Sequence, residues 1–168
     1  SVASLFFKAD IQSYVTQEFG VVLSLEYIVI GLFAFMIGLT YTPAVSLSLE
    51  GENLWLLKSL PIKASTVMYS KILFNLILVI PIALISLIML GISLEFTLLS
   101  IILLMILIIA FSVMTSCIHA VINLYLPKLD YNNDAQVVKQ SAAALMAILA
   151  VFVLMIAFGF GIYFMTKA

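Results

Sequence analysis

Apolar residues are gathered in four long runs along the chain, and each run is about as long as a helix that crosses a bilayer. A hydrocarbon core about 30 Å thick is spanned by about 20 residues of helix. Strands are a poor alternative, because residues 101–110 are apolar on every side, whereas the strands of a membrane barrel alternate between apolar and polar positions. The pattern predicts an all-α bundle of about four spanning helices, over residues 21–41, 72–90, 96–126 and 142–164.

The third run is longer than a bilayer requires. At 1.5 Å per residue, its roughly 30 residues extend about 45 Å. We therefore expect residues 119–126 to project beyond the bilayer or to lie in a protein-lined cleft. Polar residues recur in this run at intervals of three or four, which puts them on one helix face. They are Ser112, Thr115, Ser116, His119 and Asn123.

This polar face has two interpretations. One is helix packing, because Ser112, Ser116 and a following alanine repeat every fourth residue, and small residues let two helices approach closely. The other is a translocation path lined by these serines, His119 and Asn123, with His119 the best candidate. Glu26 in the first span is a further candidate, because burying an acidic side chain in a membrane costs free energy and such residues commonly have a function. The alternative is that its side chain reaches the headgroups, since it lies one to two turns inside the end of the span.

Composition supports a membrane location for the whole chain. Hydrophobic residues make up 65% of the 168 residues, charged residues make up 9%, and the mean hydropathy is +1.32. A soluble domain of this size needs roughly 25% charged residues to cover its surface. We therefore predict a single transmembrane domain over residues 1–168. Because it starts without methionine or a signal peptide, we expect it to be a piece of a longer protein.

The charge and the metal-binding residue types exclude several partners. Seven lysines, no arginine and eight acidic residues give a net charge of −1, so the chain has no basic face for nucleic acid. One histidine and one cysteine predict no metal site. We expect the cysteine, Cys117, to be a small buried side chain.

Lysine placement predicts the orientation, because short cytosolic loops of membrane proteins are enriched in lysine. Five of the seven lysines fall in or at the ends of the loops over residues 42–71 and 127–141. The other two lie near the chain ends. We therefore expect both loops to face the cytosol, in a multi-pass protein of the plasma membrane.

The first of these loops contains a predicted short helix. Glu50 and Glu52 fall in its first turn, where acidic side chains suit the helix dipole. Lys58 falls in its last turn and Pro61 ends it. Trp55 gives it an apolar side that suits the headgroup level of the membrane. The helix is either an interfacial anchor or a docking helix for a cytosolic partner, and a second helix is expected to begin after Pro61.

Two segments resemble those of one transporter family. Residues 50–61 read Glu-Gly-Glu-Asn-Leu-Trp-Leu-Leu-Lys-Ser-Leu-Pro, and residues 126–141 contain Leu-Pro-Lys-Leu-Asp followed by Val-Val-Lys-Gln-Ser. With Lys71 opening the next span, they resemble cytosolic segments of type-2 ABC exporter permeases, in the same order. The resemblance covers about residues 48–141. The chain departs from the family at Tyr131, which replaces another aromatic residue, and in length, since family permeases are longer.

The resemblance implies a membrane subunit of an ATP-driven exporter, whose cytosolic loops contact a separate ATPase subunit that binds ATP and Mg. In the first loop the implied coupling residues are Glu50, Gly51, Glu52, Trp55, Lys58, Pro61 and Lys63. In the second loop they are Lys128, Asp130 and Lys139. The expected partners are this ATPase, the lipid bilayer, and a second permease copy or a homologous permease. The resemblance implies no particular substrate.

The residues themselves argue against ATP hydrolysis by this chain. None of the seven glycines is followed by lysine, as the phosphate-binding loop of an ATPase requires. The chain has few of the residues that an intramembrane enzyme would need. Its one histidine excludes the common zinc motif, which needs two, and no paired carboxylates share a span. Secondary transport is less favoured, because no set of intramembrane acids offers a path for protons or sodium ions. The alternative to a permease is a non-transporting membrane scaffold or regulatory subunit.

Overall fold

The computed structural model describes residues 25–53, 59, 61–127, 138 and 141–167. Within these residues every regular element is helical, and four helical segments are long and apolar enough to cross a membrane. The outer surfaces of the helices carry many exposed large apolar side chains, which suit lipid rather than water. The predicted all-α bundle is thereby confirmed.

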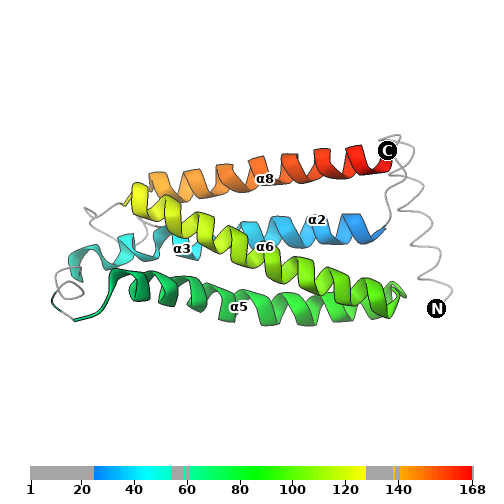
Figure 1. Ribbon diagram of the computed structural model, residues 1–168, viewed down its shortest axis with the longest axis horizontal. Coiled ribbons are helices and arrows are strands. Elements are labelled where there is room, and N and C mark those ends of the chain that lie inside the picture. Colours follow the sequence, from blue (N-terminus) through cyan, green and yellow to red (C-terminus); the bar gives the residue numbers. More distant parts are fainter. Residues whose placement is uncertain (1–24, 54–58, 60, 128–137, 139–140, 168) are drawn as a thin grey trace.

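Six helical elements follow one another through the described ranges (Figure 1). They are α2 (Leu25–Gly38), α3 (Thr42–Ser46), the 3-10 helix η1 (Ser48–Asn53), α5 (Ala64–Ser93), α6 (Leu98–Tyr125) and α8 (Ala142–Lys167). In Figure 1, α6 runs obliquely between α8 and α5. Because α6 packs against each of the other long helices, it is the centre of the bundle.

The core lies where α6 meets α2 and α5. Leu104 and Ile108 of α6 form one buried cluster with Leu87 of α5 and with Val29 and Ile30 of α2. Leu104 and Ile108 are four residues apart, which keeps them on one face of α6. The remaining faces of α5, α6 and α8 are largely exposed, as expected for helices in lipid.

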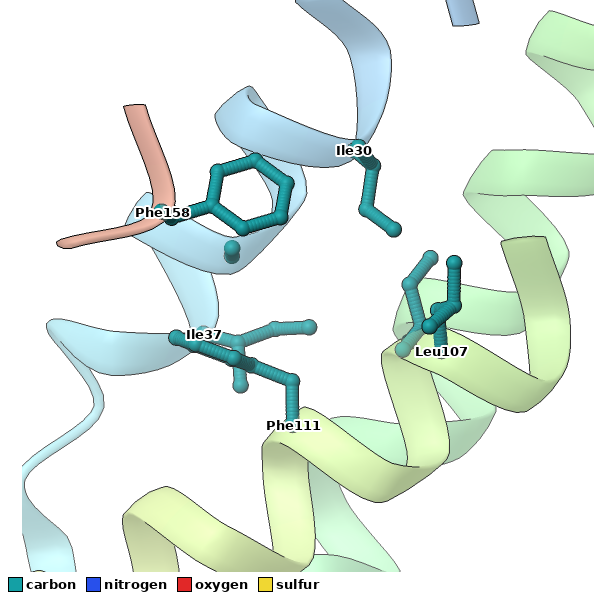
Figure 2. Close-up of a pocket in the computed structure, with 7 residues that line it drawn as sticks. Ile30, Ile37, Leu107, Phe111 and Phe158 are labelled. Atoms are coloured by element: carbon teal, nitrogen blue, oxygen red, sulfur yellow. The ribbon is translucent and has the colours of Figure 1, made fainter. Parts of the chain in front are cut away.

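A small void interrupts the core between α2, α6 and α8. Its volume is about 60 Å³. Figure 2 shows the apolar side chains around it: Ile30 and Ile37 from α2, Leu107 and Phe111 from α6, and Phe158 from α8. A void without polar groups stays dry, so the side chains around it lose packing contacts on that side.

The first span is broken, which corrects the prediction of one helix over residues 21–41. Helix α2 ends at Gly38, and the chain turns through residues 39–41 before α3 begins. Pro43 stands in the first turn of α3, where its missing N–H costs nothing, whereas within one continuous helix it would lose a backbone hydrogen bond. Residues 43–45 of the predicted cytosolic loop are consequently buried in the end of the bundle.

Two helix starts and one turn complete the frame. Thr97 accepts a hydrogen bond from the Ser100 N–H at 3.2 Å, and Ser141 accepts one from the Ala144 N–H at 3.1 Å. Both are N-caps of the following spans, α6 and α8. Between α5 and α6, Glu95 has a φ of 56°, a left-handed conformation that closes a short turn.

Helix α2 approaches α8 closely at Gly38. A Cβ at this position would lie 2.6 Å from Cγ1 of Val151. Valine is stiff in a helix because it branches at Cβ, so its methyl groups cannot turn away. Gly38 is therefore required for the close contact between these helices.

We expect Gly38→Ala to lower the stability of the full-length protein by about 2 kcal/mol, because overpacking of a tight contact forces helices apart. Val151→Ala in the same chain removes the obstructing methyl groups and should recover most of the loss. Gly31→Ala is the matched control, since no heavy atom lies within 4 Å of the added carbon. Thermal unfolding in mild detergent measures all three, and equal losses for the two glycine variants would contradict this explanation.

Candidate functional site

Asn123 joins α6 to the two short elements that follow α2. Its amide oxygen accepts a hydrogen bond from the Ser48 hydroxyl at 2.8 Å, and its Nδ2 donates to the Pro43 carbonyl at 3.2 Å. Asn123 and Ser48 are both fully buried, at 0% exposure. One side chain of α6 thus holds both α3 and η1 at the end of the bundle.

A second link joins η1 to α5. The Lys71 ammonium forms an ion pair with Oε1 of Glu50, and the two side chains are 21% and 30% exposed respectively. The other carboxylate oxygen, Oε2 of Glu50, is buried and has no hydrogen-bond partner among the described residues. We call the set Pro43, Ser48, Glu50, Lys71 and Asn123 the junction, because it connects η1 directly to α5 and α6.

Val138, from the second of the two resembling segments, lies beside the elements that follow α2. The Tyr41 hydroxyl lies 3.5 Å from the Val138 carbonyl, to which it donates. Val45 of α3 and Ala144 of α8 form a buried contact, against which Leu49 and Val138 pack. Segments that lie about 90 residues apart in the sequence are therefore neighbours.

His119 lies beside the break in the first span. The side chain is 1% exposed, and its ring lies against the backbone of Thr40 in the break and of Ala147 in α8. Its Nδ1 has no hydrogen-bond partner within the described part of the chain. Polar side chains of α6 thus surround the irregular backbone, which a membrane tolerates only where protein covers it.

The predicted polar face of α6 is present. Ser112, Thr115, Ser116, His119 and Asn123 are all buried against protein. His119 and Asn123 are buried against protein, whereas Leu124 and Tyr125 are exposed, and the position of residues 119–126 relative to the bilayer stays a prediction. Cys117, expected to be buried, is exposed on the outer side of α6.

The translocation candidates differ in what they contact. Ser116 accepts a hydrogen bond from Nδ2 of Asn75 in α5 at 2.9 Å, so it ties α5 to α6. The Ser112 hydroxyl is buried and has no partner among the described residues. Glu26 is half-buried in the first turn of α2. In a single chain, Ser116 and Asn123 hold neighbouring elements together, as the packing interpretation expects.

The coupling residues are described only in part. Glu50 and Gly51 lie in η1, and Pro61 and Lys63 are exposed ahead of α5. Glu52 also lies in η1. The remaining predicted residues, Trp55, Lys58, Lys128, Asp130 and Lys139, lie outside the described residues.

Sequence reasoning missed three residues of this site. Ser48 and Pro43 fall within the predicted cytosolic loop over residues 42–71, and Lys71 is predicted only as the residue that opens the second span. Pro43 is the sequence signal for the break, because a proline inside a continuous helix removes a backbone hydrogen bond and clashes with the preceding turn. No sequence signal pairs Glu50 with Lys71 across 21 positions.

Comparisons with known proteins do not assign the chain to a family. No family model, no curated protein and no solved structure matches the chain. Within the described residues, no group of three or more histidine, cysteine or acidic side chains could hold a metal ion. The functional argument therefore rests on the geometry of the junction and on the sequence resemblance.

Proposed function

We propose that the protein is a membrane-spanning permease subunit of an ATP-driven exporter of the type-2 ABC kind, which couples ATP hydrolysis by a separate cytosolic ATPase to substrate efflux. The observation that carries this proposal is the junction. A docking segment can drive a transporter only if its motion reaches the spanning helices. Here η1, at the start of the segment that resembles the family's docking loop, is bonded to α5 through Glu50 and to α6 through Ser48.

The broken first span also supports a transporter. Many transporters have interrupted helices whose irregular backbone is satisfied by neighbouring side chains. Here Asn123 and His119 of α6 face the break between α2 and α3. In this proposal, the break would let the two halves of the span change their relative orientation, and the contacts with α6 would set that orientation.

The orientation that we propose follows the lysines. The helix ends that flank the two lysine-bearing loops are the start of α5, the end of α6 and the start of α8. These helix ends lie at the end of the bundle that carries the junction, which would face the cytosol. The partner ATPase would bind ATP and Mg there, because the chain has no phosphate-binding loop of its own. The membrane would be the plasma membrane, and a second permease copy or a homologous permease would complete the exporter.

The competing function is a non-transporting scaffold or regulatory subunit. It is favoured by the buried hydrogen bonds of Ser116 and Asn123, which serve a static bundle equally well. A scaffold needs no ATPase, so the two functions differ in their partner.

Affinity capture of the full-length protein from its native membranes in mild detergent tests the proposal. We expect ATP hydrolysis in the eluate and an ATPase subunit of matching amount. Trp55→Ala should reduce the captured ATPase about tenfold, since a large aromatic anchor is a common hot spot of binding. Phe164→Ala is the control, because it removes an exposed aromatic side chain near the opposite end of α8.

Glu50 is unsuitable for this capture test, because its charge also pairs with Lys71. A folded wild-type protein that captures no ATPase would refute the exporter and leave the scaffold. Equal capture by the Trp55→Ala and wild-type proteins would remove the docking role from the first loop.

A further inference from the structure

A groove runs along the side of the bundle between α2 and α5. Its volume is about 570 Å³, within the range of pockets for small organic ligands. The groove exists because α2 packs mainly on α6 and α8, while α5 packs mainly on α6, so the two helices diverge. It is lined by Leu32, Phe33, Met36, Ile37, Thr40, Thr42, Asn75, Leu78, Val79, Ile82, Ala83, Ser86 and Leu90.

The lining is graded along the groove. Nine of its 13 lining side chains are apolar, and none is charged. Ser86, a polar residue among them, donates its hydroxyl to the Ile82 carbonyl of its own helix. Three of the four polar residues lie at the end of the groove near the junction. Thr40 and Thr42 follow the end of α2, and Asn75 lies in the first half of α5. The groove therefore offers hydrocarbon along most of its length and hydrogen-bonding groups at one end.

The polar end has unused hydrogen-bonding capacity. Asn75 is 3% exposed, and its Nδ2 is committed to Ser116. Its amide oxygen accepts no hydrogen bond from the described residues, which leaves an acceptor in a groove-lining side chain. The Thr40 hydroxyl donates to the Ile37 carbonyl and keeps its acceptor capacity. Thr42 adds an exposed hydroxyl that can donate or accept.

These features select one ligand chemistry. A hydrocarbon chain fits the apolar walls, and a hydroxyl or amide N–H fits the acceptors at the end. A charged headgroup does not fit, because none of the lining side chains is charged and Lys71, one turn from Asn75 on α5, is already paired with Glu50. We infer that the groove binds an amphiphile with one hydrocarbon chain and an uncharged headgroup that donates hydrogen bonds.

The inference that the groove binds such an amphiphile is independent of the proposed function. The further step, that this amphiphile is the exported substrate, rests on the proposed function. A molecule of this class dissolves in the bilayer, and the groove lies on the side of the bundle. Such an amphiphile can therefore enter the groove directly from the membrane, without crossing the water phase. The polar end lies next to the junction, where motion of η1 would reach it.

Photolabelling of the full-length protein in nanodiscs tests the inference. The probe is a monoacylglycerol that carries a diazirine in its chain, and labelled peptides are identified by mass spectrometry. We expect labels on α2 and α5 residues of the groove. The fatty acid anion with the same chain should label these peptides about tenfold less, because its charge has no partner there.

Two variants of adjacent residues give a matched control. Leu78→Trp fills the groove and should reduce labelling about tenfold. Ile77→Trp makes the same change on α5 at an exposed position outside the groove lining and should leave labelling unchanged. Thr42→Val keeps the side-chain shape, removes the hydroxyl, and should reduce labelling about fivefold, as the loss of one hydrogen bond does.

Equal labelling of the Leu78→Trp and Ile77→Trp proteins would overturn the inference. So would equal labelling by a diazirine phospholipid, because the groove would then hold ordinary bilayer lipid. The experiment needs no ATPase. Groove labelling without ATPase capture would support the binding site and refute the exporter, whereas capture without groove labelling would do the reverse.

Discussion

Asn123→Leu should lower the stability of the full-length protein by about 3 kcal/mol, the largest loss that we expect from one substitution. The side chain is fully buried and bonds both Ser48 and Pro43 to α6. Interhelical hydrogen bonds in membranes contribute about 1 kcal/mol each, and leucine also removes the acceptor of a buried hydroxyl. Thermal unfolding in mild detergent measures the loss.

A double-mutant cycle separates the Ser48 contact from other effects. Ser48→Ala and Asn123→Ala remove the same hydrogen bond, so the double variant should lose about 1 kcal/mol less than the sum of the single losses. Leu124→Ala is the matched control, because its side chain is exposed on the neighbouring position of α6. Additive losses in the cycle would mean that Ser48 and Asn123 do not act through this bond.

Lys71→Glu should lower ATP hydrolysis by the captured complex about 50-fold, within the range of known couplings between distant sites. The change puts a carboxylate beside Glu50, so repulsion replaces the ion pair that holds η1 to α5. We expect the ATPase to remain bound, because this contact lies within the permease. Hydrolysis rates are compared at equal amounts of captured ATPase.

The charge exchange Glu50→Lys with Lys71→Glu restores an attractive pair and should recover hydrolysis to within about threefold of wild type. Loss of stability alone cannot explain such a rescue, since partly exposed ion pairs contribute only about 0.2–1 kcal/mol to folding. A double variant as inactive as Lys71→Glu would show that the pair does not transmit motion.

The helices of this fold were predictable because their signal is local. A helix in lipid needs only a long apolar run, and the apolar runs that form α5, α6 and α8 are visible in the sequence. The polar face of α6 follows from spacing in the same way. Its partners do not: Ser48 and Asn123 lie 75 positions apart, and nothing local pairs them.

The break in the first span was missed for a different reason. The segment over residues 42–48 is short and moderately polar, as a loop would be. Its burial depends on contacts with α6 and α8, which lie far away in the sequence. Pro43 indicates that a helix is interrupted, but it cannot indicate that the chain then stays inside the bundle. The groove is equally nonlocal, because it is the space left by helices that diverge.

The carbonyl of Pro43 has a consequence for biosynthesis. Its hydrogen-bond donor on α6, Asn123, is encoded 80 positions later. At about 5–20 residues per second, the ribosome supplies that side chain about 4–16 s after the proline. Until then the break cannot sit in lipid at full stability, since its backbone lacks the α6 side chains that cover it. The first span therefore reaches its final position only when α6 joins it, and membrane insertion of this protein is a cooperative step of several helices.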